Sequence, residues 1–348
     1  MKIGIIGTGW GARTQVPAFR SAGLEVSALA GRDVDKTRTM AAELSVEAFD
    51  DWRMLMAAVD LVSIVTPPLY HREMTLAAIQ AGKHVLCEKP TAVNAHEAYE
   101  MVTAAKARSQ QITLIDHELR FLPSWRAARD RMAELGEIRF AEVRYSSPSR
   151  ADARRPWNWW NDRKQGGGAW GAVGSHYADA LRYFIGEIEA VQALLNTFVG
   201  ERPFEGGLKE VTSDDFAAVH LRLERGVLAV MTFSSVSALD EPTVLTIHGE
   251  NGGFRFTGSD WYRAKPGGAF ELQSVPDDVP ASTVGNSKGG SFGTGTVYLG
   301  RALKSALVDG DRQALAPAAT FADGLAQQRV LDAARRSQAE DGRWVRVE

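Results

Sequence analysis

A glycine-rich turn directly after the first apolar segment constrains the fold of this chain more than any other feature. The letters G-T-G-W-G-A occupy positions 7–12, between the short apolar segment 2–6 and a stretch that can form a helix. In a G-x-G-x-x-A pattern, the first glycine permits a tight turn and the second lets backbone N–H groups approach a pyrophosphate. The small last residue allows close helix–strand packing, and the helix N-terminus adds partial positive charge. We therefore predict a dinucleotide site whose residues in this turn are Gly7, Thr8, Gly9, Trp10 and Ala12.

Up to about residue 120, short apolar segments alternate with segments of helical period, which is typical of crossover units in a parallel sheet. The expected strands are 2–6, 25–30, 60–65, 84–88 and 112–115. Apolar residues at i, i+3, i+4 and i+7 indicate helices over 74–81 and 98–105, and the second should begin near Asn94, which has capping-box spacing to Glu97.

Beyond residue 120, strands follow one another with few helices between them, which predicts a mostly antiparallel sheet. Its expected strands include 219–224, 226–233 and 243–248, with a helix after Gly168 and helical segments near 297–309 and 318–336. Residues 284–295 are rich in Gly, Ser and Asn and predict a mobile loop. The expected fold class is α/β, with a Rossmann domain over 1–120 and an α+β domain over 121–348.

Composition excludes several classes of protein. A chain of 348 residues is long enough for two domains, and 45% hydrophobic with 24% charged residues is typical of a globular protein without a membrane span. The formal charge of −3, without a basic stripe, argues against nucleic acid as a partner. The single Cys87 and the absence of Cys/His pairs at zinc spacing predict neither a disulfide nor a metal site. With no secretory signal recognisable in the first residues, we expect a cytoplasmic location.

The end of the second strand bears on the choice between NAD and NADP. A carboxylate about 20 residues after the glycine turn would hold the adenine ribose of NAD. Here the sequence reads Ala30-Gly31-Arg32-Asp33, with glycine in place of the acid. A guanidinium can pair with a 2′-phosphate, so we favour NADP as the cofactor over NAD. The alternative is that Arg32 stacks on the adenine while Asp33 binds the ribose.

Two further strand ends are candidates for the chemical site. One strand ends in Thr66-Pro67-Pro68 and the next in Cys87-Glu88-Lys89-Pro90. Ligands of open parallel sheets bind beyond the carboxyl ends of the strands, so both segments should face the nicotinamide half of the cofactor. By spacing alone, Lys89 could equally be an ordinary surface lysine.

Several longer motifs carry a family resemblance. They are the T-P-P run with His71, A-G-K-H-V-L-C-E-K-P at 81–90, R-F-L-P at 120–123 and G-G-G-A-W-G-A-V-G-S-H-Y-A-D at 166–179. Together with the glycine turn, they resemble the glucose–fructose oxidoreductase/inositol dehydrogenase/MocA family over nearly the whole chain. The resemblance implies a Rossmann domain joined to an open-faced sheet that contacts substrate and mediates homo-oligomerisation, as a dimer or tetramer.

The resemblance also implies hydride transfer between NAD(P) and a carbinol or carbonyl carbon of a sugar, cyclitol or related polyol. Its usual active-site pair falls on Lys89 and His176. Removal of hydride from a carbinol carbon requires a base for the hydroxyl proton, and histidine titrates near neutral pH, so His176 is the expected base. A charged Lys89 beside the oxygen would stabilise alkoxide character. Cofactor contacts are expected from Thr66, Pro67, Pro68, His71, Glu88 and Lys89.

The chain departs from the family pattern at Ala172, where an aspartate is common. A changed reaction or a loss of activity is therefore open. The resemblance offers redox-assisted glycoside cleavage as the alternative reaction, and Ala172 motivates a further alternative, a nucleotide-binding regulator without catalysis. Asp179, one helical turn after His176, could orient the imidazole, bind a substrate hydroxyl or serve helix packing. Trp159 and Trp160 could stack on a sugar ring or pack a loop.

Arg120 is the remaining candidate for a substrate contact. Its guanidinium could bind an anionic or polyhydroxy substrate, or it could form an interdomain salt bridge.

Overall fold

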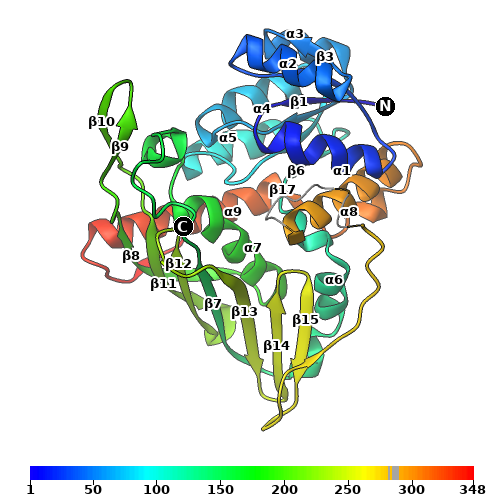
Figure 1. Cartoon of the computed structure of the whole chain (residues 1–348). Coiled ribbons are helices and arrows are strands. Elements are labelled where there is room, and N and C mark those ends of the chain that lie inside the picture. Colours follow the sequence, from blue (N-terminus) through cyan, green and yellow to red (C-terminus); the bar gives the residue numbers. More distant parts are fainter. Residues whose placement is uncertain (281–282, 284–289) are drawn as a thin grey trace. The chain divides into compact units, whose positions relative to one another are not determined.

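The computed structural model describes residues 1–280, 283 and 290–348, which form two compact units (Figure 1). Unit 1 comprises 1–92, 96–123 and 276–325, and unit 2 comprises 93–95, 124–275 and 326–348. The division expected from sequence was 1–120 and 121–348. Contacts group 276–325 with the first unit instead, because the helix in this segment buries its apolar face there.

Unit 1 is built on a seven-stranded sheet with Rossmann topology. Its strand order is β17-β6-β5-β4-β1-β2-β3, and only β17, paired with β6, is antiparallel. The strands are β1 (Lys2–Ile6), β2 (Glu25–Ala30), β3 (Glu47–Phe49), β4 (Leu61–Ile64), β5 (His84–Cys87), β6 (Thr113–Ile115) and β17 (Ala319–Thr320). The five expected strands are confirmed. Sequence reasoning missed β3, whose three residues are partly or fully exposed and give no apolar run.

Helices connect these strands, as the βαβ pattern predicts. They are α1 (Val16–Ser21), α2 (Val34–Leu44), α3 (Trp52–Ala58), α4 (His71–Gln80), α5 (Ala95–Lys106) and α8 (Gly290–Leu307). Helix α1 continues from a single π-helical turn, Gly11–Gln15.

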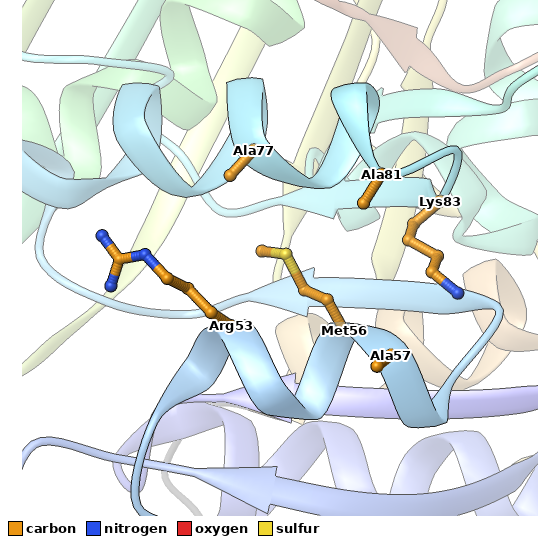
Figure 2. A pocket seen from close by; sticks show the side chains of 6 residues that line it. All are labelled: Arg53, Met56, Ala57, Ala77, Ala81 and Lys83. Carbon is orange, nitrogen blue, oxygen red and sulfur yellow. The ribbon is translucent and has the colours of Figure 1, made fainter.

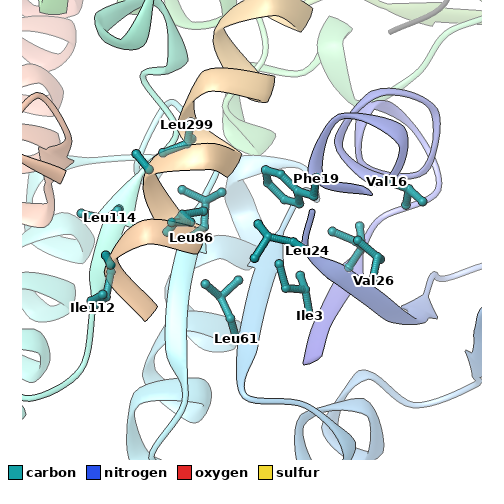
Figure 3. Packing of buried hydrophobic residues seen from close by; sticks show 14 of the residues in the cluster. Ile3, Val16, Phe19, Leu24, Val26, Leu61, Leu86, Ile112, Leu114 and Leu299 are labelled. Atoms are coloured by element: carbon teal, nitrogen blue, oxygen red, sulfur yellow. The ribbon is translucent and has the colours of Figure 1, made fainter. Parts of the chain in front are cut away.

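The core of unit 1 joins the sheet to α1 and α8 (Figure 3). Leu299 and Leu303 of α8 are buried in the same cluster as Phe19 of α1. The two helices approach closely, because a Cβ at Gly300 would lie 2.9 Å from Ala22 Cβ and 3.0 Å from Phe19 Cδ1. This packing explains why 276–325 belongs to unit 1.

The predicted mobile loop at 284–295 needs a correction in its second part. Residues 284–289 lie outside the described residues, whereas 290–295 form the first turns of α8. Gly293 and Gly295 are buried there, and a Cβ at Gly295 would lie 2.6 Å from Glu118 O. The glycines that suggested a loop instead permit close contact between a helix and a neighbouring segment.

Unit 2 is built on a nine-stranded sheet of order β16-β15-β14-β13-β7-β12-β11-β8-β18. All neighbours are antiparallel except β7 and β12, so the expected mostly antiparallel sheet is confirmed. The strands are β7 (Ile138–Ser146), β8 (Ile188–Asn196), β11 (Phe216–Leu223), β12 (Leu228–Ser234), β13 (Glu241–Gly249), β14 (Gly252–Thr257), β15 (Asp260–Ala264), β16 (Glu271–Leu272) and β18 (Val345–Arg346). A separate hairpin joins β9 (Glu201–Phe204) to β10 (Gly207–Glu210).

Helices α6 (Pro123–Asp130), α7 (Ser175–Phe184) and α9 (Phe321–Ala339) complete the fold. Aromatic contacts pack α6 and α7 on one face of the large sheet. Trp125 and Phe184 contact Phe256 of β14, and Tyr177 contacts Phe233 of β12.

The opposite face of this sheet carries exposed apolar side chains. Phe140, Leu194, Leu228 and Val230 are exposed, and they alternate along their strands with buried residues. We call these four residues the open face. A search of the described helices finds none that is both long and apolar enough to cross a membrane.

Candidate functional site

The glycine turn after β1 is shaped for the approach of a ligand. Gly7 has φ +141°, and a Cβ there would lie 2.2 Å from Val65 O, so a side chain is excluded. Gly11 packs against Ile5, since its Cβ would lie 2.6 Å from Ile5 Cγ2. A Cβ at Gly9, by contrast, would meet nothing within 4 Å. The turn is therefore tight on the protein side and open at Gly9, as contact with a pyrophosphate requires.

The end of β2 leaves no room for a side chain at position 31. A Cβ at Gly31 would lie 2.6 Å from Thr37 Oγ1 and 2.7 Å from Thr8 Cγ2. Arg32 is exposed. Asp33 is the N-cap of α2, where its Oδ1 accepts a hydrogen bond from the Lys36 N–H at 3.0 Å.

His71 links the two predicted strand-end segments from within the protein. Its ring is fully buried, with Nε2 2.8 Å from Thr66 O and Nδ1 3.0 Å from Pro90 O. Burial lowers its pKa to about 4, so the ring is neutral near pH 7. The Lys89–Pro90 peptide bond is cis. The neutral ring has one N–H and donates to one of these two carbonyl oxygens, so His71 packs between the Thr66–Pro68 segment and the turn that carries Lys89.

A buried hydrogen-bond network lies beside Lys89. Gln15 Nε2 donates to Asp116 Oδ2 at 2.8 Å and to Glu88 Oε1 at 3.4 Å. Ser63 Oγ donates to Gln15 Oε1 at 2.6 Å. Glu88 and Asp116 thus accept from the same Gln15 amide nitrogen, and both side chains are buried.

Burial raises the pKa of both carboxyl groups in this network. For Asp116, burial has the largest effect, and the nearby charges of Glu118 and Glu88 raise its pKa further. For Glu88, burial also dominates, while the Lys89 ammonium acts in the opposite direction. Burial therefore favours the protonated form of both groups, and the positive charge of Lys89 opposes this effect at each of them.

Arg120 forms an ion pair within unit 1. Its Nη2 lies 3.3 Å from Asp323 Oδ1, and the Arg120 side chain is buried. The second oxygen of Asp323 accepts hydrogen bonds from the N–H and hydroxyl of Thr320 at 2.8 and 2.7 Å. Arg120 therefore has a structural partner at the start of α9.

In unit 2, the glycine run before His176 is packed against neighbouring backbone. A Cβ at Gly167 would lie 2.3 Å from Trp160 O, and one at Gly168 would lie 2.4 Å from Asp214 Oδ1. Asp214 Oδ2 accepts a hydrogen bond from the Trp170 N–H at 2.7 Å. Burial raises the pKa of Asp214 to about 6. This carboxyl group thereby fixes the start of the π-helical turn Trp170–Gly174 that leads into α7.

His176 and Asp179 both lie in the first turns of α7 and are buried, with 5% and 1% of their surface exposed. Ala172, in the preceding π-helical turn, is half-buried. Trp159 and Trp160 form a short 3₁₀ turn capped by Asn158, and both rings are partly exposed. These candidates are therefore gathered on consecutive, mutually packed segments of unit 2.

A surface pocket lies elsewhere in unit 1, between α3 and α4. It has a volume of about 400 Å³ and is lined mainly by apolar side chains, as Figure 2 shows; none of the predicted site residues contributes to it. Lys83 at its rim donates a hydrogen bond to Val59 O at 2.8 Å. Among the described residues, no three His, Cys, Asp or Glu side chains come together in a way that could hold a metal ion.

Comparison with known families agrees with this geometry. The model of an oxidoreductase family with an NAD-binding Rossmann fold matches residues 1–115, and the model of the GFO/IDH/MocA C-terminal domain matches residues 125–255. The chain belongs to the GFO/IDH/MocA family.

Relatives and solved structures match from 72% to 100% of this chain. Glucose-fructose oxidoreductase domain-containing protein 2 of Mus musculus is 32% identical over 99% of this chain and 93% of its own length. An uncharacterized oxidoreductase of Synechocystis sp. is 34% identical over 72% of this chain and 70% of its own length. Levoglucosan dehydrogenase, solved with NADH and levoglucosan, superimposes with a TM-score of 0.88 at 23% identity, covering 100% and 99% of the two chains.

Sequence reasoning on this GFO/IDH/MocA protein missed three buried polar residues. Gln15 and Asp116 organise the strand-end network. Asp214 organises the glycine run. A polar residue that immediately follows a buried strand, as Asp116 does, was the available signal for one of them. For Gln15 and Asp214, the sequence alone gives no such signal.

The raised pKa of Asp116 predicts a pH-dependent effect of Asp116→Asn. A raised carboxyl pKa in the folded state costs stability as the pH rises above the pKa of the unfolded chain, and asparagine removes that cost. The variant should therefore gain roughly 2–8 °C more in unfolding temperature, relative to the native chain, at about pH 8 than at about pH 5. Thermal unfolding followed by circular dichroism at both pH values is the measurement.

The exposed Asp130, changed to Asn, is the matched control and should show no such pH dependence. An equal effect of Asp116→Asn at both pH values would contradict the raised pKa of Asp116.

Proposed function

We propose that this GFO/IDH/MocA protein transfers a hydride between a nicotinamide cofactor and a carbinol or carbonyl carbon of a sugar, cyclitol or related polyol. The observation that carries the proposal is Lys89 at the carboxyl end of β5, whose backbone N–H donates to the buried Glu88 carboxyl group at 3.2 Å, in a family of NAD-binding oxidoreductases. Levoglucosan dehydrogenase, which shares the fold, was solved with NADH and a sugar-like ligand.

The residues of the glycine turn suit a dinucleotide. Gly9 is open, Gly7 excludes any side chain, and the carboxyl ends of β1 and β4 lie at the point where the strand order reverses. In our proposal, the turn binds the pyrophosphate and the Thr66–Pro68 and Glu88–Lys89 segments position the nicotinamide half. The bound cofactor supplies the hydride acceptor or donor.

We assign the proton chemistry to Lys89 and His176. The imidazole of His176 accepts the hydroxyl proton when the carbinol carbon is oxidised, and returns it in the reverse direction. The ammonium of Lys89 stabilises negative charge on the substrate oxygen. Glu88 balances the charge of Lys89, and His71 is a positioning residue for the turn that carries it.

Replacing the proposed base tests this assignment. His176→Ala should lower kcat by about a hundredfold while leaving the Kd of the cofactor nearly unchanged, because only the proton acceptor is lost. Turnover is followed by the absorbance of the reduced nicotinamide, with aldoses, cyclitols and glycosides as substrates and both cofactors supplied. His96→Ala, an exposed histidine on α5, is the control and should keep full activity.

Undiminished turnover in His176→Ala would remove this residue from the mechanism. Release of an aglycone without net cofactor reduction would favour redox-assisted glycoside cleavage instead. Cofactor binding without any reaction across the panel would favour a regulator.

We further propose that NADP is the preferred cofactor. The absence of space for an acid at position 31, the exposure of Arg32 and the engagement of Asp33 as a helix cap support this preference. A guanidinium at this strand end can pair with a 2′-phosphate, which NAD lacks.

The change Arg32→Gln tests the cofactor preference. It should raise KM for NADP about tenfold or more and leave KM for NAD within about twofold, because only NADP presents the phosphate. Lys36→Gln, an exposed cation on the next helical turn, is the control. A strong preference of the native enzyme for NAD would contradict the proposal.

We also propose that the chain forms a homodimer or tetramer through the open face of the large sheet. Four exposed apolar residues on β7, β12 and β8 of one sheet are a patch of the kind that marks protein interfaces. Size-exclusion chromatography with light scattering should find an oligomer, and Val230→Glu should convert it to monomer by placing an uncompensated charge in the interface. Leu208→Glu, in the separate β9–β10 hairpin, should leave it intact; a monomeric native chain would contradict the proposal.

A further inference from the structure

Three arginines in unit 2 gather at the loop that follows β7. Arg202 is buried and donates to two carbonyl oxygens of this loop, Asp152 O at 2.7 Å and Arg150 O at 2.6 Å. Arg155 donates to Ser149 O. Both guanidinium groups thus fix the loop through its backbone and bring their positive charges close to Arg150.

Arg150 differs from the other two arginines in its contacts. Its Cζ lies 4.3 Å from the centroid of the Trp160 ring, so the guanidinium lies over an indole face. Burial, and then the charges of Arg155 and Arg202, lower its pKa to about 10, which leaves it charged at neutral pH. Within the part of the chain that the structure describes, no carboxylate forms an ion pair with Arg150.

The nearest carboxylate along the loop already has a partner. Asp152 accepts from Arg154 at Nε and Nη2, at 2.9 and 3.1 Å, and from the Arg154 N–H at 3.0 Å. In addition, Arg202 Nε is buried without a hydrogen-bond partner. Asp215 and Asp152 offset part of the positive charge of Arg202, whereas no carboxylate in the described part of the chain pairs with Arg150, so an anion bound beside Arg150 would be stabilised.

We propose that Arg150, with the Trp160 indole and the neighbouring Arg155, binds the anionic group of the substrate. The substrate is then an acidic sugar derivative, and its carboxylate or phosphate pairs with the guanidinium fork. This inference rests on the proposed function, because it names the substrate class of the same site.

Contacts within unit 2 connect the cluster to the segment that carries His176. The carbonyl oxygen of Trp160 accepts a hydrogen bond from Ser213 Oγ at 2.9 Å. The same oxygen packs against Gly167. Asp214, which follows Ser213 in the chain, accepts a hydrogen bond from the Trp170 N–H at the start of the turn into α7. The indole beneath Arg150 and the turn before His176 are therefore fixed by two consecutive residues.

Isothermal titration calorimetry on the full chain tests the site directly. The probes are inorganic phosphate, D-glucuronate and neutral D-glucose at fixed ionic strength. At least one anion should bind and glucose should not, and Arg150→Gln should weaken anion binding about tenfold or more. Binding of glucuronate alone would indicate a sugar acid, and binding of phosphate alone a sugar phosphate.

Two matched variants control for loss of folding and of stacking. Arg222→Gln removes a second arginine that lies over an indole, with Cζ 4.4 Å from the Trp344 centroid, and should leave anion binding within about twofold. Arg150→Lys keeps the charge without the planar fork and should restore binding in part. Anion binding that is absent, or equal in the native chain and Arg150→Gln, would overturn the proposal.

Turnover separates this proposal from the proposed function. If the chain oxidises neutral polyols and Arg150→Gln leaves kcat/KM for them unchanged, the proposed function stands and the proposal of an acidic substrate is wrong. If anion binding depends on Arg150 but the chain never reduces or oxidises the cofactor, the anion site stands and the proposed function is wrong.

Discussion

Two carboxyl groups buried side by side are the constraint on which the functional edge of unit 1 depends. Glu88 and Asp116 follow adjacent parallel strands, so the register of β5 and β6 itself brings them together. Two buried negative charges in contact would be far more costly than one charge and one proton. Gln15 can donate to both because it lies in the first helical turns after the glycine turn. One network therefore fixes the dinucleotide turn, the end of β4 and the turn that carries Lys89.

The same principle organises unit 2 with a single carboxyl group. Asp214 binds the backbone N–H of Trp170, and Gly168 must be glycine because any Cβ would strike that carboxylate. The glycine run is thus required by packing against Asp214 and Trp160 rather than by flexibility. A π-helical turn follows at once, and helical turns of this kind are often found at functional sites. His176 enters α7 from a segment whose backbone leaves it little freedom.

Much of the fold follows from the sequence, because the strands of unit 1 other than β3 and β17 are short apolar runs bounded by polar residues or glycine. Segments 2–6 and 25–30 were predicted to the residue. The prediction of a loop at 290–295 was wrong, because glycine is found both in turns and at close contacts between segments. Only the tertiary structure distinguishes these two cases. The network around Gln15 could not be predicted, since its members lie up to 101 residues apart. The assignments of Lys89 and His176 came from family resemblance, since spacing alone left Lys89 open.

Ala172, which stands where the family commonly has aspartate, can be interpreted together with the arginine cluster. A carboxylate at that position would suit a neutral polyol, whose hydroxyl groups can donate hydrogen bonds to it. It would repel a substrate that carries its own carboxylate or phosphate, and removing it favours that substrate over a neutral one. Ala172 removes a negative charge from the same unit in which Arg150 adds an uncompensated positive one. Both departures change the electrostatic potential of unit 2 in the same direction, which is the direction that our proposal of an acidic substrate requires.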